Sequence, residues 1–193
     1  MKSWIIILIV VVLLALIVGG SYATIHNTIV TKSETVRSAW SEVDVDLQRR
    51  ADLIPNLVET VKGIAAQEQT VFKDIADARA ALLGAQSPED KIAANGRVDG
   101  ALGRLLAIVE NYPQLKSSEN FLKLQDELAG TENRIAVSRK NYNDAIQDYN
   151  TYIQQFPNNL VASRVGFKRN DAYFQATEAS RAVPKVQFPA PTH

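Results

Sequence analysis

An uncharged, apolar run at the N-terminus constrains this chain more than any other feature. No formally charged side chain stands between Lys2 and Lys32, and every residue from Trp4 to Val18 is apolar. The stretch from Ser3 to Ile25 holds 23 residues, and about 20 helical residues cross the ~30 Å hydrocarbon core of a bilayer. The run therefore predicts one transmembrane helix that anchors the protein in a membrane.

The ends of the run carry aromatic residues, which prefer the headgroup level of a bilayer. The side chains expected to mark the anchor are Trp4, Leu8, Val12, Leu16 and Tyr22. A cleaved secretory signal is one alternative, because Ser21 and Ala23 place small residues at the −3 and −1 positions of a cleavage site. A buried core helix is another, although it would show polar positions on its outer face. We expect an uncleaved anchor, since the run is longer than most signals need.

The charges that flank the run bear on its orientation. Lys2 and the free amine stand immediately before it, whereas Lys32 and Arg37 follow at a distance. The positive-inside bias then holds the short N-terminal end in the cytoplasm and predicts an extracytoplasmic domain. The chain has no cysteine, which fits an oxidising compartment without requiring one.

Beyond the anchor, apolar residues recur at alternating spacings of three and four, which indicates helices throughout. The longest such stripe joins Phe121 to Phe156, and its 3.5-residue period is typical of helices that wrap around a partner. Asp52 before Pro55 and Ser87 before Pro88 supply helix-start signals. We expect four amphipathic helices, over about 28–51, 53–83, 89–111 and 118–156.

These helices predict an all-α fold. Short connections force neighbouring helices to be antiparallel, so the expected architecture is an N-terminal transmembrane helix followed by an up-and-down four-helix bundle of long, coiled-coil-like helices. The expected division is an anchor over 1–27, a bundle over 28–156 and a tail over 157–193. The main alternative is a single long first helix kinked at Pro55, which would leave three helices.

Small residues form a stripe on the expected third helix. Glycine inside a helix costs up to about 1 kcal/mol relative to alanine, so Gly96, Gly100 and Gly103 indicate that something approaches closely. It is either a tight helix crossing inside the bundle or a contact between subunits. The fourth helix is also longer than the third, so its end from Tyr149 to Phe156 is a second candidate oligomer interface.

The tail mixes apolar, aromatic and basic residues, as segments at a membrane surface do. If the fourth helix returns toward the bilayer, the tail begins beside the membrane. The residues expected in a membrane-interface segment are Arg164, Phe167, Lys168 and Arg169. The alternative is a tail that packs over the open end of the bundle.

The composition gives little support for catalysis. Histidine occurs only at His26 and His193, so the bundle holds no Ser-His-Asp triad and no Glu-x-x-His metal pattern. No glycine-rich phosphate loop follows a strand. We therefore expect no catalytic residue, cofactor or metal site, and a buried polar pocket lined by Glu68, Asn133 or Tyr142 would argue otherwise. The cluster of Arg49, Arg50 and Asp52 is interpreted as a surface ion-pair network.

Several stretches resemble the LemA family. They are AWSEVDVDLQRRADLIPNLV at 39–58, ENF at 119–121, TENRIA at 131–136, YN at 142–143 and 149–150, FP at 156–157, GFK at 166–168 and PKVQF at 184–188. The resemblance implies a bacterial single-pass membrane protein with an antiparallel helical bundle. Some members of the family are associated with building intracellular membrane compartments.

Together these observations predict a non-enzymatic scaffold in the bacterial inner membrane. It would self-associate and organise or shape the membrane surface, so the expected partners are the lipid bilayer and further copies of the chain. Its 21 basic and 21 acidic residues balance, which predicts no nucleic-acid partner. One alternative is an accessory protein that binds another membrane protein or signalling component. A second is an unrecognised ligand-binding or enzymatic bundle.

Overall fold

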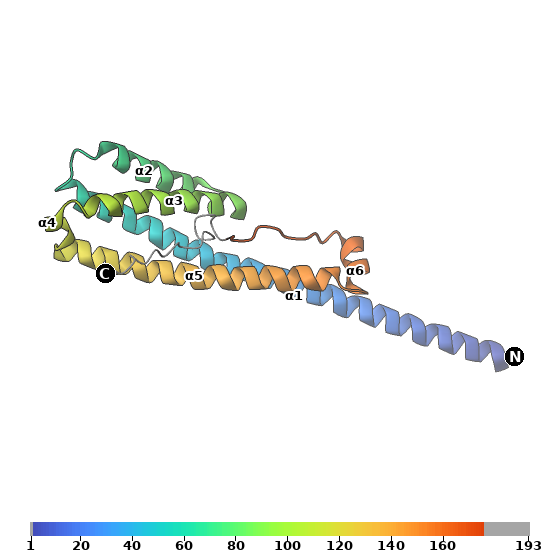
Figure 1. Cartoon of the computed structure of the whole chain (residues 1–193). Coiled ribbons are helices and arrows are strands. Elements are labelled where there is room, and N and C mark those ends of the chain that lie inside the picture. Colours follow the sequence, from blue (N-terminus) through green and yellow to red (C-terminus); the bar gives the residue numbers. More distant parts are fainter. Residues whose placement is uncertain (1, 176–193) are drawn as a thin grey trace, which may run out of the picture.

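The structure is a computed structural model that describes residues 2–175, and the described part is all-helical (Figure 1). The predicted all-α class is confirmed. The helices are α1 (Lys2–Lys62), α2 (Gln69–Gly84), α3 (Pro88–Val109), α4 (Pro113–Lys116), α5 (Glu119–Gln154) and α6 (Asn158–Val165). The expected tail lies within the described residues as far as residue 175, and 176–193 lie outside them.

Helix α1 is continuous from the apolar run to Lys62. It crosses the expected boundary between anchor and bundle at residues 27 and 28 without a break. The prediction that one helix ends at residue 51 and another begins at 53 is wrong, because the chain leaves the helix only at Gly63 and α2 begins at Gln69. The three-helix alternative is correct in running through Pro55 but wrong in extending that helix to residue 83.

Pro55 is tolerated inside α1 because another helix supplies the missing hydrogen bond. Proline has no N–H to donate to the carbonyl four residues earlier, which here belongs to Ala51. Arg79 of α2 donates from Nε to the Ala51 oxygen at 2.8 Å. The Pro55 ring itself is exposed, so it crowds no neighbouring helix. A long-range contact has therefore overridden a local helix-breaking signal.

The four long helices pack chiefly as two pairs. Helix α1 packs along α5, and α2 packs along α3. Figure 1 shows that α1, α2, α3 and α5 alternate in direction and that the α2–α3 pair covers only the half of the α1–α5 pair farther from the N-terminus. Residues 167–175, called the tail segment below, run back along the other half after α6.

The predicted inner stripe of α5 holds over most of its length. Ile135 and Tyr142 are buried as predicted and the intervening Lys140 is exposed, but Leu128, which was also expected to be buried, is only half-buried. A 3.5-residue stripe that ends at Phe156 passes through Ala145 and Tyr152, but toward the end of the helix the structure buries Ile146, Asn150 and Ile153 instead. A straight α-helix drifts about 20° per heptad from a 3.5-residue repeat. The tail segment covers the side of α5 to which the stripe has moved.

Arg50 corrects the predicted surface ion-pair network. Its neighbours Arg49 and Asp52 are exposed, but Arg50 is buried between three helices. Its guanidinium pairs with Asp99 of α3 and lies 3.2 Å from Glu132 of α5. The network therefore fixes α1 against both α3 and α5.

Candidate functional site: the membrane-proximal end and the open face of α1 and α5

The N-terminal part of α1 extends beyond the rest of the protein (Figure 1). Every side chain from Ser3 to Thr24 is exposed, and within residues 2–175 only α1 is long and apolar enough to cross a membrane. A core helix would bury such side chains against its neighbours. The exposed set includes all the predicted anchor residues, namely Trp4, Leu8, Val12, Leu16 and Tyr22. Length, composition and exposure together suggest membrane anchoring.

Helix α6 lies at the level where the bare part of α1 leaves the bundle. Figure 1 shows α6 crossing the end of α5 on the side from which that bare part emerges. The Phe167 ring, which follows α6, packs edge-on against His26 with 6.1 Å between ring centroids. His26 in turn stacks on Tyr22. The residues around α6 are thus placed beside the last turns of the apolar run.

The two faces of α6 differ in character. Asn158, Val161 and Ala162 are buried against the bundle. The other side of the segment exposes large apolar side chains, with Leu160 59 % and the preceding Phe156 80 % exposed. Arg164 follows Leu160 by one helical turn and is also exposed. Of the predicted membrane-interface residues, Arg164, Lys168 and Arg169 are exposed and Phe167 is half-buried.

Two asparagines of α5 hold the tail segment through its backbone. Asn143 donates from Nδ2 to the Phe174 carbonyl at 2.9 Å and accepts from the Phe174 N–H at 3.0 Å. Asn150 makes the same pair of bonds to Asn170, at 2.6 and 2.9 Å. Tyr149 also donates to the Lys168 carbonyl at 2.9 Å. These hydrogen bonds are made to main-chain groups, so they recognise an extended chain rather than particular side chains.

An aromatic cluster completes the attachment of the tail segment. Phe174 stacks on Trp40 and meets Tyr142 edge-on, with centroid separations of 6.2 and 6.0 Å. The Arg139 guanidinium lies 5.1 Å from the Phe174 ring centroid, within cation–π range. Burial raises the pKa of Tyr142 to about 12 and also raises the pKa of Tyr149. Both phenols stay neutral at physiological pH and suit a water-poor contact.

The tail segment covers apolar surface of α5 that was predicted from the sequence to contact a second copy of the chain. Tyr149, a predicted oligomer-interface residue, is buried and bonded to Lys168, whereas Phe156 at the other end of that candidate is exposed. Sequence reasoning missed the role of Asn143 and Asn150. A signal was present, because the dipeptide Tyr-Asn recurs at 142 and 149, which puts both asparagines on one side of α5 two turns apart.

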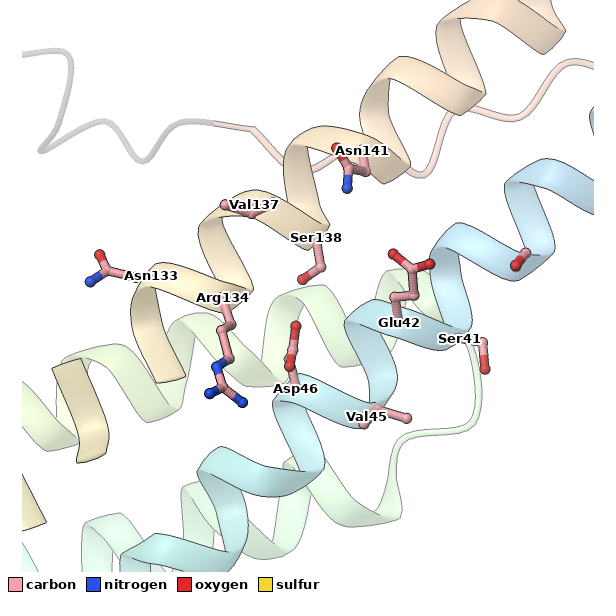
Figure 2. A pocket seen from close by; sticks show the side chains of 10 residues that line it. Ser41, Glu42, Val45, Asp46, Asn133, Arg134, Val137, Ser138 and Asn141 are labelled. Carbon is pink, nitrogen blue, oxygen red and sulfur yellow. The ribbon is translucent and has the colours of Figure 1, made fainter. Parts of the chain in front are cut away.

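On the other face of the α1–α5 pair lies an open groove. Figure 2 shows Glu42 and Asp46 of α1 and Arg134 and Ser138 of α5 pointing into the space between the two helices. The groove has a volume of about 680 Å³. We call this groove the open face; it is lined by Ser38, Ser41, Glu42, Val45, Asp46, Asn133, Arg134, Val137, Ser138 and Asn141.

The open face combines exposed apolar side chains with opposite charges. Val45 of α1 and Val137 of α5 are 59 % and 61 % exposed, although β-branched aliphatic residues are usually buried. Within residues 2–175, none of Glu42, Asp46 and Arg134 forms an ion pair with another side chain. Some exposed charges elsewhere are paired along their own helix, as Lys140 is with Asp144.

The glycine stripe on α3 is also exposed. A Cβ added at Gly96 or Gly103 would meet nothing within 4 Å, and one at Gly100 would meet only the tip of Arg104. The expected tight crossing inside the bundle is therefore wrong for the described residues. The glycines line shallow hollows, one between α2 and α3 and one between α3 and α5. A contact between subunits remains the prediction for this stripe.

The residues proposed for a polar pocket do not come together. Asn133 lines the open face, Tyr142 lies in the aromatic cluster, and Glu68 precedes α2 in the turn after α1. Among the described residues there is no group of three or more His, Asp or Glu side chains that could hold a metal ion.

The model of the LemA family matches residues 39–188 of this chain. The chain belongs to the LemA family. Two of its relatives are magnetosome proteins, MamQ 2 of Paramagnetospirillum magneticum at 33 % identity and MamQ of Magnetospirillum gryphiswaldense at 30 %. The alignments cover 80 % and 78 % of this chain. The chain spans 66 % and 65 % of the length of these relatives. A third relative is Protein LemA of Metamycoplasma hominis, 25 % identical over 83 % of this chain and 73 % of its own length.

The LemA match coincides with the parts of the molecule described above. It begins at residue 39, beyond the membrane-proximal part of α1, and includes Trp40 and both Tyr-Asn dipeptides. It also continues past the described residues to 188. The tail segment and its contacts on α5 therefore fall inside the LemA region of the chain.

Proposed function

We propose that this LemA protein is a non-enzymatic, membrane-anchored scaffold, built as an antiparallel helical bundle, that self-associates and thereby organises or shapes a membrane surface. The observation that carries the proposal is the open face of α1 and α5, which exposes Val45 and Val137 beside charges that are unpaired within the described residues. Contiguous apolar surface rimmed by polar groups is typical of protein contact sites. We infer that the occupant of the open face is the same face of a second copy.

The geometry of anchored copies favours this pairing. Copies in one membrane share a direction, so a two-fold axis between them runs along the membrane normal and keeps equivalent residues at equal height. Such an axis along the groove sets α1 of one copy against α5 of the other. Glu42 and Asp46 then face Arg134 of the second copy, and opposite charges meet on both sides of the axis. Val45 and Val137, which lie on the outer sides of the two helices (Figure 2), flank these charges in the pair.

Confinement to a membrane lowers the affinity that each contact needs. Anchored copies have a high effective concentration, so weak lateral contacts suffice to build a larger assembly. The exposed glycines Gly96, Gly100 and Gly103 provide further contacts by which dimers join. Relatives that are named magnetosome proteins support a role at an organised membrane. We place the protein in the bacterial inner membrane with its domain extracytoplasmic, in line with the charges flanking the anchor.

A charge-swap experiment tests self-association through the open face. The mass of the full chain is measured after gentle extraction and again after reconstitution into bilayers. Arg134→Glu places three acidic groups around the groove and should shift the protein to monomer. Combining it with Glu42→Lys and Asp46→Lys restores opposite charges and should restore the oligomer. Because these side chains are half-buried or exposed in one copy, helicity should not change.

Lys123→Glu is the matched control. It makes the same charge change on an exposed position of the same helix, outside the open face, and should leave the mass unaltered. Wild-type protein that stays monomeric over a wide concentration range, in bilayers as in detergent, would refute the scaffold. A foreign protein that co-purifies in fixed stoichiometry and is lost in Arg134→Glu would instead make the chain an accessory to another membrane protein.

A further inference from the structure

We propose that α6 and its flanking residues form a second membrane attachment, which lies in the headgroup layer and binds anionic phospholipid. The inference deepens the proposed function, since it rests on the anchoring of the protein, but it does not depend on self-association. Its occupant is the bilayer into which α1 inserts. Three independent observations carry it: the height of α6 along α1, the exposed apolar side chains, and the exposed basic ones.

The height follows from contacts with α1. The 23 residues from Ser3 to Ile25 span about 34 Å of helix, which fills the ~30 Å hydrocarbon core. Each headgroup layer adds roughly 5–8 Å, because the whole bilayer measures ~40–45 Å. His26 follows the span directly and contacts Phe167 at 6.1 Å between ring centroids. Residues at this level therefore lie in the headgroup layer.

The orientation of α6 exposes its apolar residues where lipid would be. Figure 1 shows α6 crossing the end of α5 rather than continuing it, on the side where α1 leaves the bundle. Its buried residues face the bundle, so Leu160 lies on the opposite side. Phe156 and Val165 flank it and are 80 % and 41 % exposed. In water such side chains would be costly, whereas partial immersion at a bilayer surface would bury them.

The charges beside α6 specify the kind of lipid. Lys32 pairs with Asp148, and Arg169 pairs with Asp171, so these four groups neutralise one another. Within residues 2–175, the exposed Arg164 and Lys168 have no acidic partner. Basic side chains at a membrane surface attract anionic lipids. The segment thus combines apolar side chains that would be immersed in the bilayer with a net positive charge.

The tail segment keeps α6 in this position. It continues directly from α6 through Gly166, whose φ of 91° turns the chain back along α5. Asn150 and Tyr149 then hold the backbone of the tail segment at residues 170 and 168. A short helix that is fixed at both ends presents one constant face to the bilayer. The contacts of Tyr149 and Asn150 consequently hold α6 at the membrane as well as packing the tail segment against α5.

Spin labels measure immersion directly, because the native chain has no cysteine to compete for the label. Leu160→Cys and, separately, Phe156→Cys are labelled in the full chain, which is reconstituted into phosphatidylcholine vesicles with or without phosphatidylglycerol. Collision rates with oxygen, which partitions into lipid, are compared with those of a water-soluble nickel chelate. We expect oxygen to dominate at both positions. Leu122→Cys is the control, since Leu122 is 46 % exposed near the start of α5, at the opposite end of that helix, and the chelate should dominate there.

The anionic arm uses the Leu160→Cys protein with Arg164→Glu and Lys168→Glu added. In the Leu160→Cys protein, the preference of the label for oxygen over the chelate should increase when phosphatidylglycerol is added. In the protein that also carries Arg164→Glu and Lys168→Glu, phosphatidylglycerol should cause no such increase. Equal access of the chelate to residues 160 and 122 would overturn the membrane attachment. Low access of both oxygen and the chelate to residue 160 would mean that a protein, and not lipid, covers it. Insensitivity to phosphatidylglycerol would overturn the anionic preference. Immersion of residue 160 in protein that is monomeric by mass would retain this inference while refuting the scaffold.

Discussion

Replacing Asn150 by alanine should release the tail segment while the helices stay folded. The Asn150 amide makes two hydrogen bonds to the Asn170 backbone and a third to the Tyr173 hydroxyl at 3.1 Å. Each such bond contributes a net 0.5–1.5 kcal/mol, so the loss of all three amounts to roughly 2–4 kcal/mol. Since 1.4 kcal/mol is about a factor of ten, the open population of the tail segment should rise about 30- to 700-fold.

Limited trypsin digestion of the detergent-solubilised full chain measures that population. The tail segment offers Lys168 and Arg169 as cleavage sites, and cleavage follows the open population when opening is fast. Asn143→Ala removes only two bonds, both to Phe174, and should give a smaller acceleration. Asn141→Ala is the matched control, because Asn141 is exposed on the same helix and lines the open face instead.

Equally fast cleavage of the tail segment in Asn150→Ala and in wild type would show that the Asn150 bonds do not hold this segment. An equal acceleration of cleavage at Arg79 in α2 and at Lys91 in α3 would instead indicate global destabilisation. The expected order of cleavage rates is Asn150→Ala, then Asn143→Ala, then Asn141→Ala together with wild type. Any other order would mean that the backbone contacts do not set the stability of the tail segment.

Two further predictions concern the core. Ile135→Ala should lower the free energy of unfolding by about 2–5 kcal/mol, because Ile135 is fully buried. An unchanged thermal midpoint would show that the α5 register is wrong. Val137→Ala is the control, because Val137 is exposed. Tyr142 should make the protein alkali-sensitive. Burial raises its pKa from 10.0 to about 12, so its stabilisation is fully present below pH 10 and declines as the pH rises toward 12. Urea unfolding over this range should show a slope that Tyr142→Phe reduces.

The apolar pattern was sufficient to predict the helical class and the inner face of α5. Ile135 and Tyr142 are buried as their spacing predicts, because burial of one face dominates the stability of long amphipathic helices. The same reasoning failed at Pro55, since its cost in α1 is offset by Arg79, which lies 24 residues later in the chain. A local signal cannot show that a distant side chain will bond to the Ala51 carbonyl.

The attachment of the tail segment was unpredictable for a different reason. Asn143 and Asn150 bind backbone groups, which every sequence possesses, so the bound residues carry no matching pattern. The distinctive side chains are Phe167, Tyr173 and Phe174, and their partners His26, Asn150 and Trp40 lie far away in the chain, on α1 and α5. The burial of Arg50 was missed likewise, because Asp99 and Glu132 come from two helices whose packing the sequence does not specify.

Because α1 is unbroken, a tilt of its apolar end would move the whole domain as one rigid unit. With its 61 residues, α1 is about 90 Å long, and no joint separates its bilayer end from Lys62. The part beyond Ile25 extends roughly 55 Å from the membrane. Transmembrane helices are tilted by about 20° from the bilayer normal on average, and a tilt of that size displaces the far end of α1 sideways by roughly 20 Å. If α1 tilts to match a thinner bilayer, the domains beyond the membrane would therefore change their spacing and angle.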